Sequence, residues 1–424
     1  MLKRISPSQV EMGMFVHKLE GSWFKHPFWK AKFVLDDPAT LEDLRDADID
    51  AVVIDISKGR DVLVRRGDTP AARPGPIPAA KPAPQRRRFV TPSAPAPFDY
   101  RSTAPQTTAR EFGHANRTAD RGRKVVTRMF LEMRLGKTIP AQAVEPVVED
   151  IFASVQRNPH AFNGLMRCKQ DNEFLYRHAL ACSALMISLA RALKLSPNEI
   201  REAGMAGLMF DVGVNLLPID LAEYGNDHRR LPPEVLMQHA ELGANFLEAS
   251  GLPPAISMVA RHHHERSDGQ GYPARLSGGD IPLLSRMAAI CDAYDELASF
   301  MPGSAVVDPG AVLQTMSAQR GRFDSEIFAA FVQCMGTFPI GTFVELKSGR
   351  LALVSDQNPV DTSKPTVRPF FSLATGKSLR SEDIDLANCF GADEIVGLAD
   401  LSHFATEETM KLRTRMLATL AKGG

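Results

Sequence analysis

The sequence lacks the marks of a secreted, membrane-spanning or nucleic-acid-binding protein. Its five cysteines are odd in number and form no Cys-x-x-Cys pair, so neither a disulfide framework nor a zinc ribbon is expected. Basic and acidic residues number 50 each, which leaves no basic excess to attract nucleic acid. No apolar run reaches the ~18 residues of a membrane span, and residues 1–19 have no apolar signal-peptide core. We therefore expect a cytoplasmic protein with no membrane span and no nucleic-acid partner.

The N-terminal part of the chain divides by composition into a small domain and a linker. Short apolar runs in residues 1–66 are typical of buried strands and predict a small α+β domain. Its predicted elements are strands at 14–17, 51–56 and 61–66 and a capped helix at 40–47. Residues 67–123 are rich in proline, alanine and arginine. Such a segment buries too little apolar surface to offset its ordering entropy, so we expect a disordered linker.

Helical periodicity begins near Lys124 and continues to residue 337, with apolar residues recurring at i, i+3 and i+4. The predicted helices span 125–133, 143–155, 172–193, 197–209, 233–249, 254–264, 283–299 and 311–318. Some carry clear start signals: Ser196-Pro197-Asn198-Glu199 supplies a capping residue, a first-turn proline and an acid three places after the cap. The sequence therefore predicts an all-helical domain at 124–337.

The pattern changes again in the C-terminal part. Strands at 341–346 and 351–354 predict a hairpin around a Lys-Ser-Gly-Arg turn, and 367–373 adds another strand. Residues 338–400 are therefore expected to form a small β appendage. Residues 401–424 contain an amphipathic helix. It is either a docking or self-association element, which would make the protein a homo-oligomer, or an exposed, solvated helix.

The most distinctive stretch, residues 261–273, reads Arg-His-His-His-Glu-Arg-Ser-Asp-Gly-Gln-Gly-Tyr-Pro. Imidazole is the commonest protein ligand for divalent transition metals, and a turn with two glycines and a proline holds one backbone shape. The histidines together with this turn indicate a metal centre beside a rigid substrate loop. The same residues are equally consistent with a basic helix C-terminus followed by an ordinary turn.

Further candidate ligands occur through the helical domain. His178 lies inside an apolar helix, where it needs a polar partner. Asp211 follows a helix, His239 lies within one, and Asp292 shares a helical face with Asp295 at i, i+3 spacing. Each alone has a structural explanation, such as a hydrogen-bonded core histidine or a surface acid. Their order along the chain is more specific.

That order resembles the HD-GYP family, bacterial metal-dependent phosphohydrolases that act on the second messenger cyclic di-GMP. The resemblance covers roughly residues 172–316, and residues 263–273 match the family's second signature throughout. The resemblance implies an HD-type all-helical fold and iron or manganese, which activates water and neutralises a phosphodiester. It also implies a cyclic dinucleotide as ligand and a protein partner in a signalling pathway. The first domain resembles the small N-terminal domain that often precedes such modules.

The resemblance also implies roles for residues of this chain. Asp211 would be the bridging ligand, with His239, His263 and His264 completing one metal site and His178 and Asp292 the other. Asp211 and His264 would be central to catalysis. The substrate side would be formed by Arg266, Gly271, Tyr272 and Pro273.

The departures from the family fall on its catalytic residues. Phe210 replaces the histidine of the family's His-Asp pair, and Val214 replaces a lysine. Phe174 stands where an acid is expected, and 301–304 reads Met-Pro-Gly-Ser in place of an Arg-Pro-Tyr-Arg segment. Losing even a supporting partner weakens a metal site roughly 10- to 100-fold, so one ion is expected in place of a pair. Fewer cations also predict weaker binding of a cyclic dinucleotide.

Three hypotheses follow. The first is a degenerate HD-GYP protein with a regulatory or interaction role, and we place it narrowly ahead. The second is an active cyclic di-GMP phosphodiesterase with a reduced or unusual metal site. The third is a scaffold whose histidines are structural and bind no metal.

Overall fold

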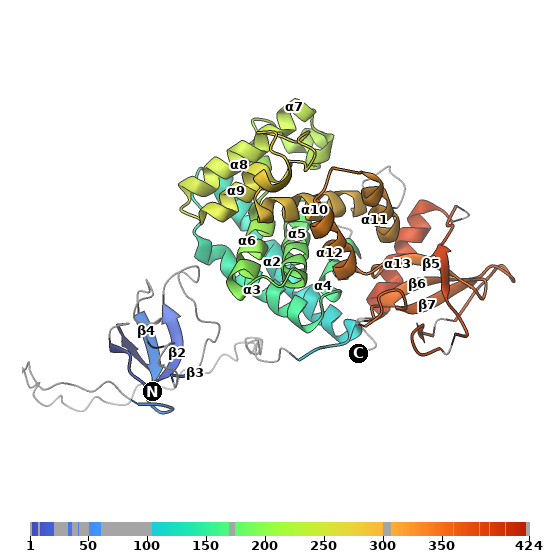
Figure 1. The fold of residues 1–424 in the computed structure, drawn as a ribbon, viewed down its shortest axis with the longest axis horizontal. Helices are drawn as coiled ribbons and strands as arrows, with labels where there is room; N and C mark the ends of the chain where they lie inside the picture. Colours follow the sequence, from blue (N-terminus) through green and yellow to red (C-terminus); the bar gives the residue numbers. More distant parts are fainter. Residues whose placement is uncertain are drawn as a thin grey trace, which may run out of the picture. The chain divides into compact units, whose positions relative to one another are not determined.

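The chain divides into two compact units, Met1–Ser102 and Thr103–Gly424 (Figure 1). The computed structural model describes residues 2–6, 9–20, 33–35, 41, 51–60, 104–168, 174–299, 307–358, 360–380, 382–389, 391–402 and 404–420. Among the helices in these ranges, none combines the length and hydropathy needed to cross a bilayer. The multidomain architecture expected from the sequence is confirmed.

The N-terminal unit is built on a four-stranded antiparallel sheet with the order β1-β4-β2-β3. Its strands are β1 (Leu2–Ile5), β2 (Phe15–Glu20), β3 (Phe33–Val34) and β4 (Ala51–Asp55). Alternate residues such as Val16, Val52 and Ile54 are fully buried in a small core, as half-buried strands require. The predicted strands at 14–17 and 51–56 are confirmed. The predicted strand at 61–66, and the helix at 40–47 apart from Leu41, lie outside the described residues.

Helix α2 (Thr108–Arg134) corrects the predicted boundary between linker and helical domain. The chain is helical from Thr108, not from about Lys124, and residues 67–103 lie outside the described residues. The apolar stripe of this helix is thin and interrupted by polar side chains, so its periodicity is weak in the sequence. Glu111 is fully buried yet satisfied, because Arg157 of α3 donates to it at 2.7 and 2.9 Å. This buried ion pair ties α2 to the helical domain.

The helical domain surrounds α5 (Phe174–Ala192), which is buried on nearly all sides, as expected of a helix in the centre of a core. Figure 1 shows α5 running through the middle of the helical body. Packed around it are α3 (Ala141–Arg157), α4 (Ala161–Cys168), α6 (Pro197–Met209), α10 (Leu283–Ala298) and α12 (Ser325–Met335). The capping box predicted at Ser196 and Glu199 is present. Of the predicted helices, only 233–249 is divided, into α7 (Pro233–Leu236) and α8 (Gln238–Ala249).

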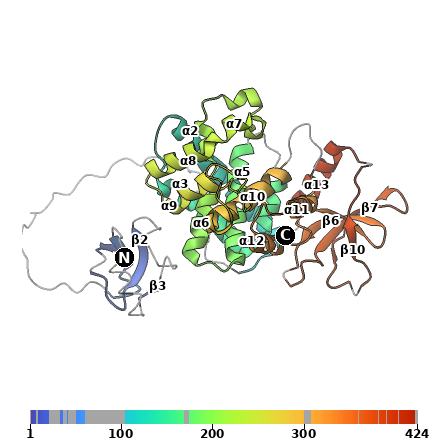
Figure 2. The same cartoon turned by 45° about the horizontal axis from the view of Figure 1, so that its top comes forward.

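The C-terminal β region forms an antiparallel sheet with the order β10-β5-β6-β7-β8, and β9 also pairs with β7. The strands are β5 (Phe343–Leu346), β6 (Arg350–Asp356), β7 (Thr366–Ser372), β8 (Lys377–Ser378), β9 (Ile384–Asp385) and β10 (Ile395–Leu398). The hairpin and the third strand are therefore confirmed. Figures 1 and 2 place this sheet at the end of the helical body opposite α8 and α9.

Helix α13 (Thr406–Leu420) packs within its own chain. Met416 and Leu417 are buried in one core with Phe112 of α2, Ala161 of α4 and Phe343 of the sheet. The predicted exposed, solvated helix is therefore wrong for this apolar side, which the rest of the chain covers. The β region is likewise no detached appendage, because its inner face and the helical domain share this core.

Candidate metal centre

The candidate ligands come together where several helices end. His178 lies on α5, Asp211 directly after α6, and His239 in the first turn of α8. His263 is the C-cap of α9 (Pro254–His262), and Asp292 lies on α10. Helix ends bring side chains from distant parts of the sequence to one place while the helices keep the backbone rigid. All six residues predicted as ligands lie in this one centre.

Asp211 is positioned by close contact between η3 (Val212–Leu216) and α8. A Cβ atom on Gly213 would collide with the carbonyl oxygen of His239 and would lie 2.6 Å from the backbone nitrogen of Gly243. Only glycine permits this approach. The carboxylate of Asp211 is thereby held beside His239, and the residue is 7% exposed.

The first ligand group consists of Asp211, His239, His263 and His264. Oδ1 of Asp211 lies 3.3 Å from Nε2 of His239 and 3.4 Å from Nε2 of His263. Nε2 of His239 lies 3.2 Å from Nε2 of His263 and also 3.2 Å from Nε2 of His264. His262, the first residue of the triplet, is in no ligand group of the described residues and lies near Glu265 instead.

The hydrogen bonds on the far side of two rings assign their tautomers. Nδ1 of His239 donates to the carbonyl oxygen of Leu236, and Nδ1 of His263 donates to that of Ala260. Both rings therefore present the lone pair of Nε2 to the centre. Lone pairs this close repel each other unless they bind a cation. The four donors consequently fit a divalent metal that prefers nitrogen and oxygen ligands.

The second ligand group consists of His178, Asp211 and Asp292. Nε2 of His178 lies 3.2 Å from each of these two carboxylates. Nδ1 of His178 donates to Asp295 at 2.8 Å, which turns the Nε2 lone pair toward the same two carboxylates. A bound cation would satisfy this lone pair and both anions, and without an ion a proton on Nε2 takes its place. Asp211 is common to both groups, as its predicted bridging role requires.

The pKa shifts show how strongly the buried carboxylates and imidazoles of the two ligand groups act on one another. Burial alone would raise the pKa of Asp211, but hydrogen bonds from His178, His239 and His263 hold it well below its usual range. Burial alone would lower the pKa of His178, yet Cys182 and the neighbouring carboxylates raise it well above its usual range. Burial and the adjacent histidines lower the pKa of His264. The centre thus keeps an ionised carboxylate beside at least one neutral imidazole, the forms that bind metal.

The loop after the histidines is held in shape by its own residues. A Cβ on Gly271 would lie 2.5 Å from the backbone nitrogen of Arg266, so the turn closes only with glycine there. Glu265 is 2% exposed and accepts hydrogen bonds from the backbone N–H groups of Ala274 and Leu276. Tyr272 stacks on His264 with ring centroids 4.7 Å apart. The loop therefore forms a firm wall beside the ligand groups.

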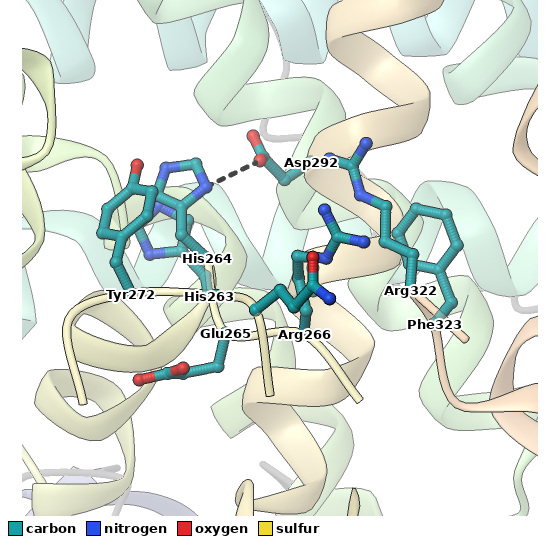
Figure 3. A pocket seen from close by; sticks show the side chains of 11 residues that line it. His263, His264, Glu265, Arg266, Tyr272, Asp292, Arg322 and Phe323 are labelled. Atoms are coloured by element: carbon teal, nitrogen blue, oxygen red, sulfur yellow. Dashed lines mark ion pairs between the residues drawn. The ribbon is translucent and has the colours of Figure 1, made fainter. Parts of the chain in front are cut away.

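A pocket of about 260 Å³ opens next to this wall (Figure 3). It is lined by His263, His264, Glu265, Arg266, Gln270, Gly271, Tyr272, Ala289, Asp292, Arg322 and Phe323. Three of the four predicted substrate residues, Arg266, Gly271 and Tyr272, are in this lining. Pro273 instead lines a wider hollow of about 740 Å³, which shares Gln270, Gly271 and Tyr272 with the pocket.

Comparison with known proteins identifies the family. The model of the HD domain matches residues 165–327, and that of a domain of unknown function (DUF3391) matches residues 2–144. A cyclic di-GMP phosphodiesterase of Pseudomonas aeruginosa is 36% identical over 94% of this chain and 92% of its own length. The chain belongs to the HD-GYP family. Two other relatives match shorter parts of the chain. The cyclic di-GMP phosphodiesterase response regulator RpfG of Xanthomonas campestris is 32% identical over 34% of this chain and 39% of its own length. A 3'3'-cGAMP-specific phosphodiesterase of Vibrio cholerae is 28% identical over 37% of this chain and 30% of its own length.

The departures from the HD-GYP pattern are built into the packing. The ring of Phe210 packs between His178 and His263, with centroid distances of 5.9 and 4.7 Å. Val214 is buried in an apolar cluster. The ring of Phe174 stacks on His178 at 5.3 Å. Each replacement thus fills its space with apolar atoms. Residues 301–304 lie outside the described residues.

Several residues of the site were not assigned roles from the sequence. Asp295 orients His178, and its i, i+3 spacing from Asp292 was the available signal. His228 is buried behind His178, and its Nε2 lies 3.5 Å from Glu296. Arg322 reaches the pocket from a loop far along the chain, and no local pattern marks it.

Proposed function

We propose that this protein is a metal-dependent phosphodiesterase of cyclic dinucleotides, with cyclic di-GMP as the expected substrate. One observation carries the proposal: the carboxylate of Asp211 lies within 3.4 Å of Nε2 of His178, His239 and His263, so both ligand groups share it. The match to a cyclic di-GMP phosphodiesterase along nearly the whole chain supports the choice of substrate.

The residues divide the chemistry between them. Asp211, His239, His263 and His264 would hold one ion, and His178 with Asp292 would hold a second, weaker one. We propose iron or manganese, which accept mixed imidazole and carboxylate ligands. A bound divalent ion supplies Lewis-acid activation of water and neutralises phosphoryl charge. The loop around Tyr272 excludes bulk water from one side, and Asp295 keeps His178 in its binding tautomer.

The deciding experiment measures hydrolysis of cyclic di-GMP by protein purified without oxygen and loaded with ferrous iron or manganese. Wild type should turn over, and His264→Ala should abolish turnover while remaining folded. His262→Ala removes an adjacent imidazole outside the ligand groups and should retain turnover. A folded wild type that is inactive with both metals would overturn the proposal of an enzyme.

The second candidate, which the sequence alone places narrowly first, is a regulatory protein that binds the dinucleotide without hydrolysing it. The observation in its favour is that Phe210 and Val214 are packed as core residues, which removes a ligand and a cation from the family's set. Stoichiometric binding of cyclic di-GMP without product would support this candidate. A protein partner and a homo-oligomer remain proposals that belong with it.

A further inference from the structure

Two guanidinium groups line the pocket beside the ligand groups, and they differ in their surroundings. Arg266 and Arg322 are both labelled in Figure 3, and both line the pocket together with Asp292. Arg266 belongs to the loop that follows the histidine triplet, whereas Arg322 comes from the short connection between α11 (Pro309–Ala318) and α12. The two arginines therefore approach the pocket from separate parts of the chain.

Arg266 is already neutralised by a neighbour. Its Nε and Nη2 atoms donate to Asp268 at 3.0 and 2.6 Å. The Arg322 side chain, by contrast, donates to the neutral amide of Gln319 at 2.8 Å and lies 5.1 Å from the ring of Phe323. Within the described residues no carboxylate forms an ion pair with Arg322. Its positive charge is thus available to an anion in the pocket.

The backbone around Arg322 is held against the motif loop. The N–H of Ser267 donates to the carbonyl oxygen of Arg322 at 3.0 Å. Asp324 caps α12 through the N–H groups of its first turn and pairs with Arg286 at 2.7 Å. Arg322 is therefore a half-buried side chain on an anchored backbone, and its position relative to His264 is set by these contacts.

We propose that Arg322 is a substrate-binding residue that holds a phosphate of the cyclic dinucleotide. It would take over the charge lost at Val214, which has become part of the core. The ring of Phe323 lines the same pocket, and an aromatic face beside a phosphate-binding arginine suits a nucleotide better than a free phosphate ion. This inference rests on the proposed function and assigns a residue that the motif does not contain.

The test is calorimetric binding of cyclic di-GMP to manganese-loaded protein, comparing wild type with Arg322→Ala. Losing a hydrogen bond to a charged group weakens binding roughly 10- to 100-fold. Arg322→Lys keeps the charge without the fork and should weaken binding less. Arg320→Ala is the matched control, because Arg320 is exposed and does not line the pocket. Metal content and unfolding temperature should be unchanged in all three variants.

The outcomes separate the inference from the function on which it rests. If wild type binds and Arg322→Ala binds equally well, the role of Arg322 is overturned while the proposed function stands. If metal-loaded wild type fails to bind cyclic di-GMP, the proposed function falls and the inference with it. Inorganic phosphate is the second probe, and affinity equal to that of cyclic di-GMP would overturn the assignment to a nucleotide.

Discussion

Phe210 shows how a single residue changes a metal centre without disturbing the fold. Its ring is 1% exposed and contacts both His178 and His263, so it fills the space where the family has an imidazole. Apolar packing of this kind stabilises the folded chain but supplies no ligand. The missing ligand weakens the group of His178, Asp211 and Asp292, which has fewer donor residues than the group that contains His239.

Phe210→His should therefore strengthen metal binding. The new imidazole would lie beside both ligand groups, and the expected gain in apparent affinity is about tenfold or more. The measurement is manganese bound per chain at limiting metal. Phe331→His places the same side chain in the core outside both ligand groups and should bring no gain. Equal binding by wild type and Phe210→His would contradict this account.

Val214→Lys should destabilise the protein even though it restores a residue typical of the family. Val214 is 1% exposed among Leu217, Leu221 and Leu231, so a lysine there would be an uncompensated buried charge. The expected cost is about 3 to 5 kcal/mol in the free energy of unfolding, measured in denaturant. Val396→Lys makes the same change at an exposed site and should alter stability by less than about 0.5 kcal/mol. A stable Val214→Lys protein would show that this cluster is open to water.

At the scale of elements, the sequence predicts best where periodicity is strong. The helix at 172–193 and the strands at 341–354 carry long apolar patterns, and both are present. The N-terminal part of α2 gives no clear apolar pattern, because its buried side includes the polar residues Glu111 and Thr118. The order of His178, Asp211, His239 and the triplet located the site. Arg322 could not be found in this way, because loops bring residues together without a periodic signal.

Glu265 should control the order of the motif loop. Glu265→Ala removes the acceptor for the N–H groups of Ala274 and Leu276, with an expected loss of about 1 to 3 kcal/mol. Amide hydrogen exchange across residues 265–277 should be faster in this variant. Glu265→Gln keeps one carbonyl oxygen as an acceptor and should show a smaller increase. Glu234→Ala, on the exposed surface of α7, is the control. Unchanged exchange in Glu265→Ala would show that Glu265 does not hold the loop in place.

At the scale of the whole molecule, metal should stabilise the second unit. A ligand that binds only the folded state at 100 times its dissociation constant adds about 2.7 kcal/mol. Manganese should therefore raise the unfolding temperature, and a chelator should reverse the effect. His263→Ala should lose most of this shift, whereas His262→Ala, one position away and outside the ligand groups, should keep it. An equal shift in both variants would place the ion elsewhere.

The division into units gives a further prediction. A chain starting at residue 103 retains α2 and should unfold cooperatively, whereas one starting at 124 loses Phe112, Ala115 and Ala119 from the core. Losing a buried phenylalanine alone costs about 3 to 5 kcal/mol. Thermal unfolding followed by circular dichroism would compare the two. Equal unfolding temperatures would mean that the first part of α2 contributes nothing to the domain.

The core shared by Phe112, Phe343, Met416 and Leu417 also bears on how the protein is made. During synthesis the ribosome releases α2 and α4 long before α13, so their apolar surface stays open until Leu417 has left the exit tunnel. Incomplete chains of this kind expose surface that favours aggregation. Nascent chains halted before residue 406 should accordingly bind chaperones, and release should coincide with the arrival of the last helix.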